Sequence, residues 1–186
     1  MDAQRAYEIA QAASRIDPGS FYGKSDNLAV GAGLIIDRVE FPIFDEEAGR
    51  FAVKAGLVYV VSHECDLDPA NERLMNELAI VCPIMKMEDF VDAATALDEG
   101  FVVGFLGNLA ARNVSRAVYL PPMGGPLPFG GMLYLNAMSH THVSKLANDE
   151  TVNLGCVTAR GLLEIDMALE RHLRRPKSDL LPLSYN

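Results

Sequence analysis

Short apolar runs follow one another through residues 28–62, with no helix-length stretch between them. The runs are rich in Val, Ile and Phe and span residues 28–44, 51–54 and 57–62. Parallel strands need a crossover of about a dozen residues or more, which this segment lacks. It therefore predicts consecutive antiparallel strands. Gly31 and Gly33 predict a bend or a close backbone approach near the start of the first strand.

The rest of the chain predicts further strands and three helices. The strands are expected at residues 78–84, with Pro83 at the strand end, and at 116–120, 132–135 and 152–157. The helices are expected at residues 2–16, at 87–97 and after Thr158, which is a suitable N-cap. Residues 100–109 are apolar and interrupted by glycine, so their periodicity does not distinguish strand from helix. These patterns predict a mostly β chain of the α+β class.

Composition sets the broad class of the protein. The 186 residues suffice for one core, and no apolar run reaches the roughly 18 residues that a membrane helix needs. Residues 1–15 lack the basic start and apolar block of a secretory signal. Cys65, Cys82 and Cys156 form no CxxC pair. We therefore expect a protein of the reducing cytoplasm, without membrane contact.

The formal net charge of −9 is concentrated in the middle of the chain. Residues 37–99 contain fifteen acidic and five basic residues, which argues against a broad nucleic-acid surface, since phosphate binding needs clustered Lys and Arg. The densest basic group lies near the C-terminus and consists of Arg171, His172, Arg174, Arg175 and Lys177. This group either complements the negative end of a helix or contacts a small anion or RNA.

The densest group of reactive side chains directly follows the apolar run at residues 57–61. An imidazole, a thiol and several carboxylates at the end of a buried strand predict a site there. The candidate catalytic residues are His63, Cys65 and Asp66. The candidate binding residues are Ser62, Glu64, Asp68 and Lys54. No cofactor is assigned from the sequence.

Several kinds of chemistry, and a purely structural role, are open for this segment. Cys65 could act as a nucleophile with His63 as its base, because both would face the same side of a regular strand, although the neighbouring acids count against a thiolate. His63 and Cys65 could also join His140 and His142 in a tetrahedral zinc site. The carboxylates of the segment could instead bind a hard cation. In the structural alternative, Cys65 packs as a small apolar residue and Asp66 accepts backbone N–H groups in a turn.

Two pairs of segments resemble MazF/PemK-like proteins. Leu57-Val58-Tyr59-Val60-Val61-Ser62 and Leu78-Ala79-Ile80-Val81-Cys82-Pro83-Ile84 resemble the family's paired strands, of which the second ends in Cys-Pro-Ile or a similar sequence. Leu154-Gly155-Cys156-Val157-Thr158 and the following helical pattern resemble its closing strand and helix. The resemblance covers residues 33–84 and 154–173. It implies a small SH3-like β-barrel, here residues 23–186 with an inserted helix and a C-terminal helix, after a helical extension at residues 1–22.

The chain departs from this family at the residues that carry its chemistry. Many MazF/PemK-like proteins are toxin ribonucleases restrained by an antitoxin, and their catalytic pair is an Arg and a Thr. Met85 stands at the Thr position, and only Lys54 or Arg50 lies near the Arg position. The Ser-x-x-Cys-Asp pattern from Ser62 is similar to that of bacterial proteins of this general architecture.

The function expected from these patterns is therefore a toxin–antitoxin or phage-defence-associated protein that acts by binding a protein or nucleic acid. A protein partner or a homo-oligomer is expected, and an RNA contact stays open. The alternatives are a hydrolase, nuclease or metal-dependent enzyme using the segment after residue 61, and a structural subunit of a larger complex.

Overall fold

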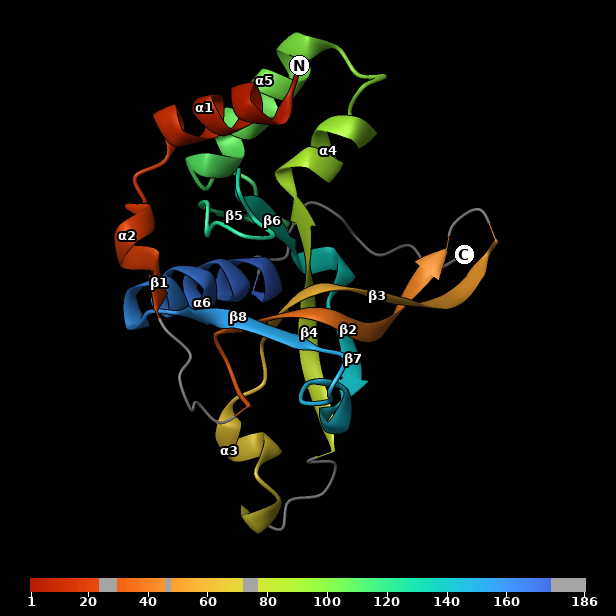
Figure 1. The fold of residues 1–186 in the computed structure, drawn as a ribbon. Helices are drawn as coiled ribbons and strands as arrows, with labels where there is room; N and C mark the ends of the chain where they lie inside the picture. The colour runs from red at the N-terminus through yellow and green to blue at the C-terminus, as the bar shows by residue number, and fades with distance from the viewer. Residues whose placement is uncertain (24–29, 46–47, 72–76, 175–186) are drawn as a thin grey trace, which may run out of the picture.

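The computed structural model describes residues 1–23, 30–45, 48–71 and 77–174. Eight strands form one antiparallel sheet in the order β1-β8-β2-β3-β4-β6-β5, and β7 pairs separately with β4 (Figure 1). The strands are β1 Tyr22–Gly23, β2 Leu34–Asp45, β3 Arg50–Val60, β4 Leu78–Lys86, β5 Ala117–Leu120, β6 Gly131–Tyr134, β7 Ser139–His142 and β8 Val152–Val157. The end strands of this path, β1 and β5, do not pair with each other, so the sheet of described strands is open.

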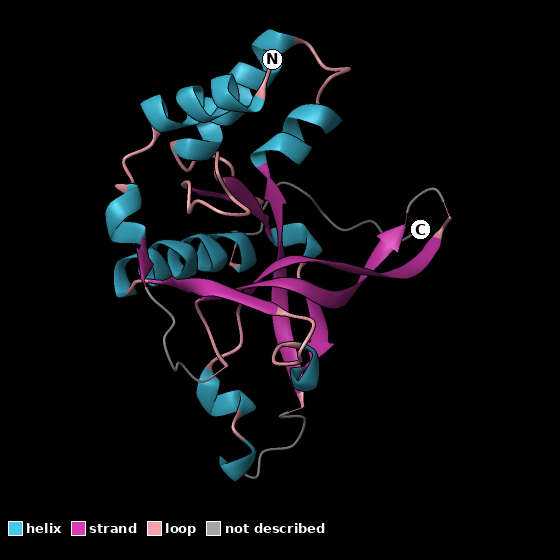
Figure 2. Cartoon of the chain, in the orientation of Figure 1, coloured by secondary structure: helices cyan, strands magenta, loops and turns pink. Residues whose placement is uncertain are grey.

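Six α-helices accompany the sheet in the described part of the chain (Figure 2). They are α1 Ala3–Ala13, α2 Pro18–Phe21, α3 Glu64–Leu67, α4 Met87–Ala93, α5 Glu99–Ala110 and α6 Ala159–Leu173. Three short 3₁₀ segments are η1 Pro69–Asn71, η2 Leu135–Ala137 and η3 Val143–Lys145. Among the described residues, no helix combines the length and apolar character that crossing a membrane requires.

The buried apolar side chains form two clusters, and both include residues of the sheet. In the larger one, α1, α4, α5 and α6 pack with β5 and β6, and it includes the fully buried Ala6, Leu106, Leu133 and Ile165. The smaller cluster lies where β2, β3 and β4 curl over one another, and it contains Val39, Val58 and Val81. Burial of the apolar side chains in these two clusters is the main force that stabilises the fold.

The class expected from the sequence is confirmed as α+β, but helix is more abundant than the expected mostly β chain allows. Residues 100–109, which the sequence left undecided, belong to α5, where Gly104 is exposed and has open space around it. The first helix ends at Ala13, and α1 contacts α4 and α5 through the buried Ala6 and Ala10. Thr158 caps α6 as expected, with its side chain accepting a hydrogen bond from Gly161 N–H.

Three details of the predicted strands were wrong. The runs at residues 51–54 and 57–62 form a single strand, β3. Pro83 lies inside β4 rather than at its end, where pairing with β3 gives way to pairing with β6. Strand β7 was not predicted, because only Thr141 of its four residues is buried. The predicted strand start at residue 28, together with Arg175 and Lys177, lies outside the described residues.

The outer part of the β2–β3 hairpin projects from the body of the protein (Figure 1). We call residues 41–45 and 50–56 the arm. Its β3 strand pairs with β2 along one edge, whereas β4 pairs with β3 only at residues 58–60, so the other edge of residues 50–56 has no partner among the described strands. Phe44 and Phe51 make an edge-to-face pair near the end of the arm, with ring centroids 5.5 Å apart.

Candidate functional site

The predicted site lies where β3 leaves the sheet, but its residues do not continue the strand. Glu64 begins the short helix α3, and His63 is its N-cap, with Nδ1 accepting a hydrogen bond of 3.3 Å from Cys65 N–H. The expectation that His63 and Cys65 share one side of a strand is therefore wrong. They approach each other because the chain turns into a helix between them.

Contacts with three separate segments fix the backbone of this turn. Ser62 Oγ accepts a hydrogen bond of 2.8 Å from Ile80 N–H of β4. Asn71 Nδ2 donates a hydrogen bond of 2.7 Å to the carbonyl of Cys65. Gly31 packs so closely that a Cβ there would lie 2.8 Å from the backbone nitrogen of Glu64. The close approach predicted at Gly31 is thus confirmed, and Ser62 has a structural role here.

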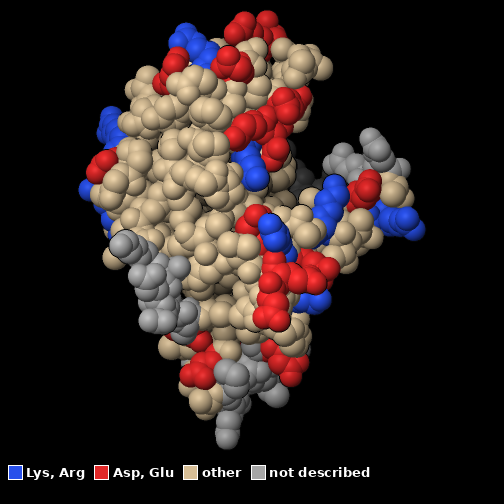
Figure 3. Space-filling model, in the orientation of Figure 1, with Lys and Arg blue, Asp and Glu red and all other residues tan. Residues whose placement is uncertain are grey.

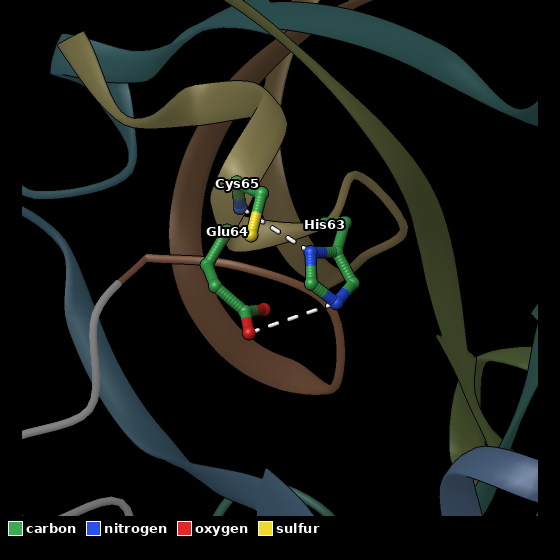
Figure 4. A group of neighbouring side chains, drawn as sticks. All are labelled: His63, Glu64 and Cys65. Carbon is green, nitrogen blue, oxygen red and sulfur yellow. Dashed lines mark hydrogen bonds and ion pairs between the residues drawn. The ribbon is translucent and has the colours of Figure 1, made fainter. Parts of the chain in front are cut away.

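The side chains of His63, Glu64 and Cys65 point toward a common space outside α3 (Figure 4). One ligand atom from each lies within 4.8 Å of the others, and His63 Nε2 is 3.6 Å from Glu64 Oε1. All three residues are exposed, so small rotations can shorten these distances. An imidazole, a carboxylate and a thiolate are the ligand types that zinc takes, and three protein ligands leave the fourth position for water.

The other candidate residues lie around or away from this group. Asp66 is exposed, and its N–H donates to the His63 carbonyl, while Asp68 Oδ1 accepts a hydrogen bond from Ala70 N–H. Asp68 thus has the kind of turn role that the sequence suggested for Asp66. Lys54 lies in the arm, six residues before Val60, the last residue of β3. At about 3.3 Å per residue, about 20 Å of strand separates Lys54 from the end of β3 where the site begins.

The predicted zinc set of four ligands does not assemble in the described residues. His140 and His142 lie on β7, and neither belongs to the group around His63. His142 instead caps η3, with Nδ1 accepting a hydrogen bond from Ser144 N–H, and its Nε2 is 3.8 Å from a carboxylate oxygen of Glu77. Glu64, predicted as a binding residue and as one of the carboxylates that could hold a hard cation, lies beside His63 and Cys65 instead.

The three cysteines occupy different environments. Cys82 is fully buried in β4, and burial raises the pKa of its thiol to about 12. Cys156 is half-buried, and Cys65 is exposed beside His63. Of the three thiols, Cys65 is the most exposed and therefore the best placed for metal binding or nucleophilic chemistry.

Met85, which the sequence comparison set against the catalytic Thr of MazF/PemK-like proteins, has a packing role in the structure. Met85 lies in β4, pairs with Met132 of β6, and packs against the larger apolar cluster. The Met85 side chain carries no hydroxyl. Arg50, the alternative to Lys54 for the family's Arg, starts β3 at the outer end of the arm.

Two features of the molecule had no signal in the sequence. Asn71, which holds the Cys65 carbonyl, is an ordinary polar residue in a predicted loop. Within the C-terminal basic group, Arg171 Nη1 donates to the Arg112 carbonyl and His172 Nδ1 donates to the Ser115 carbonyl. These bonds tie α6 to the segment after α5, a tertiary contact that local patterns do not reveal.

Comparison of the sequence with protein-family models gives no match, and comparison with curated proteins gives none either.

Proposed function

We propose that the described strands belong to a small barrel of the SH3-like MazF/PemK type, left open on one side. The curl of the sheet supports this proposal. Ser139 Oγ and Thr141 Oγ1 of β7 donate hydrogen bonds of 2.8 and 2.7 Å to backbone carbonyls of β2, at Pro42 and Glu40. Strands β2, β3 and β4 line the smaller apolar cluster, and β7 connects β4 back to β2, an arrangement that suits a small barrel.

We propose that the protein acts by binding another protein through the arm. The observation that carries this function is the apolar face of the arm beside its free strand edge. Phe44, Phe51 and Val53 are 51%, 73% and 69% exposed. Phe51 and Val53 share one face of β3, and Phe44 is the cross-strand partner of Phe51. A free edge flanked by exposed apolar side chains suits an added strand from a partner.

The charges of the arm specify the kind of strand that fits. Arg50 and Lys54 lie on the face opposite Phe51 and have no ion pair among the described residues. An added strand that alternates apolar and acidic side chains would complement both faces. A second copy fits less well, because the antiparallel register that places Phe51 opposite Val53 also places Arg50 opposite Lys54. The occupant we propose is therefore a different protein with an acidic, apolar strand.

A cytoplasmic toxin–antitoxin or phage-defence system is the setting that this function suits, given the resemblance to MazF/PemK-like proteins. In such systems a small barrel protein is held by a dedicated partner. The absence of a hydroxyl at Met85 supports a role through binding rather than through the family's ribonuclease chemistry.

Replacement of Phe51 by Asp tests the proposed function. The purified chain is titrated with a strand-length peptide that alternates apolar and acidic side chains, and the affinity is measured by calorimetry. We expect Phe51→Asp to weaken the complex at least about tenfold, because a central aromatic contact is replaced by a charge. Leu163→Asp on α6, where Leu163 is 59% exposed, is the matched control and should leave the affinity unchanged.

Two results would contradict this proposal. One is equal affinity of the Phe51→Asp and Leu163→Asp variants for this peptide. The other is a stable dimer of the chain alone, seen by light scattering and dissociated by Phe51→Asp, which would assign the arm to a second copy instead.

A metal-dependent hydrolase or nuclease is the second candidate function. The observation that favours it is the approach of His63, Glu64 and Cys65 within 4.8 Å of one another. A zinc ion held by these residues would supply an activated water at its open position. Asp66, adjacent in the chain and exposed, is the nearest additional carboxylate in sequence.

A further inference from the structure

A cleft of about 520 Å³ lies on the opposite side of the fold from the arm, where the ends of α1 and α5 meet the start of α6. Small alanine side chains from the ends of α1 and α5 form part of its wall. Its charged lining comes from three separate parts of the chain: Arg15 after α1, Arg112 after α5, and Arg160 and Glu164 on α6. The volume lies within the range of about 300–1,000 Å³ that small-molecule sites occupy.

The charge of this cleft is opposite to that of the chain. Three arginines face a single carboxylate there, whereas the whole chain carries a net charge of −9. Basic atoms accordingly gather along the edge of the molecule where α2 and the start of α6 lie (Figure 3). Like charges around one cleft repel one another, so an anion bound between them would lower the energy of the arrangement.

The one ion pair that the structure describes within the cleft leaves two of its three arginines able to bind an anion. Arg112 makes an ion pair with Glu164, so these two charges offset each other. Arg15 and Arg160 are exposed, and neither has an ion pair or side-chain hydrogen bond among the described residues. Arg112 is itself held in place, because its carbonyl accepts a hydrogen bond of 2.9 Å from Arg171 Nη1.

We infer that this cleft binds a phosphate-bearing small molecule of nucleotide size through Arg15, Arg112 and Arg160. The planar guanidinium group matches the geometry of phosphate oxygens and donates two parallel hydrogen bonds to them. Arg15 and Arg160, which have no ion pair among the described residues, can both donate hydrogen bonds to a phosphate or diphosphate group in the cleft. A long RNA needs a continuous basic track, whereas the positive charge of this cleft comes from three arginines. This site is independent of the arm and of the group around His63.

Calorimetric titration of the full chain with pyrophosphate and with ATP at low ionic strength tests this inference. We expect both probes to bind, and Arg15→Ala and Arg160→Ala each to weaken binding about tenfold or more, as loss of a charge-assisted hydrogen bond does. Arg5→Ala and Arg174→Ala are matched controls. Arg5 pairs with Glu8 and Arg174 with Glu170, both outside the cleft, so binding should stay within about twofold of the wild type.

The outcomes that would overturn the inference are distinct. If neither probe binds at millimolar concentration, the cleft is no phosphate site. If Arg5→Ala weakens binding as much as Arg15→Ala, the effect reflects the net charge rather than the cleft. A single-stranded RNA that binds more tightly than either probe, with the steep salt dependence of several phosphate contacts, would replace the small molecule with a nucleic acid. Circular dichroism of each variant checks that the fold is intact.

Discussion

Replacement of Gly31 by Ala will displace the His63–Cys65 turn and lower the free energy of unfolding by about 1–3 kcal/mol. An added Cβ would lie 2.7 Å from Glu64 Cβ and 2.8 Å from Glu64 N, closer than atoms in proteins pack. The backbone of Glu64 cannot retreat freely, because the turn is also held by Ser62 to β4 and by Asn71. The methyl group added at residue 31 is therefore expected to change both the stability of the fold and the geometry of the candidate site.

Urea unfolding of Gly31→Ala and Gly104→Ala measures this effect. Gly104 lies on the exposed side of α5 with no atom within 4 Å of an added Cβ. Alanine there should stabilise the protein by about 0.5–1 kcal/mol, since glycine is a poor helix former. The two substitutions add the same methyl group, so opposite signs would show that the contact with Glu64 is responsible. A Gly31→Ala variant as stable as the wild type would contradict the tight packing of this turn.

Cobalt(II) added to the purified protein is expected to produce a sulfur-to-cobalt charge-transfer band that Cys65→Ser abolishes. Cobalt occupies zinc sites and reports a bound thiolate by this absorption. Cys65 is exposed beside two further ligand types, whereas the Cys82 thiol is buried and its pKa is raised to about 12. A metal bound at His63 Nδ1 would replace the hydrogen bond from Cys65 N–H, which at 3.3 Å is long and weak.

Two variants separate this group from the ligand set expected from the sequence. His63→Ala should weaken cobalt binding at least about tenfold, because it removes one of three ligands. His140→Ala is the matched control, since His140 is an exposed histidine on β7 outside the group, and its band should equal that of the wild type. A band that persists in Cys65→Ser, or is lost in His140→Ala, would contradict the assignment and with it the metal-dependent candidate function.

Local patterns predicted most of the strands because burial and alternation leave direct marks in the sequence. The strand at residues 152–157 and the N-cap Thr158 are confirmed as predicted. Residues 100–109 carried no such mark, because α5 exposes Phe101 and Val103 to the surface and its apolar residues therefore show no helical stripe. In β7, polar residues at all four positions concealed a strand whose pairing depends on β4.

The location of the candidate site was predictable, and its chemistry was only partly so. A dense polar cluster directly after a buried run indicated the turn at residues 62–68, and the structure brings three of those side chains together. The switch from strand to helix at His63 could not be read from the apolar pattern, because an N-cap contact decides it. The cleft of Arg15, Arg112 and Arg160 joins residues far apart in the chain, so only the tertiary fold reveals it.

Amide hydrogen exchange of the chain, alone and with a strand-length peptide that alternates apolar and acidic side chains, tests the central claim that a partner adds a strand to the arm. Strand addition forms new backbone hydrogen bonds along the free edge of β3, so exchange in residues 50–56 should slow in the complex. Exchange in α6, which lies away from the arm, should not change. Unchanged exchange in residues 50–56 of a complex that forms, with protection elsewhere, would contradict the account.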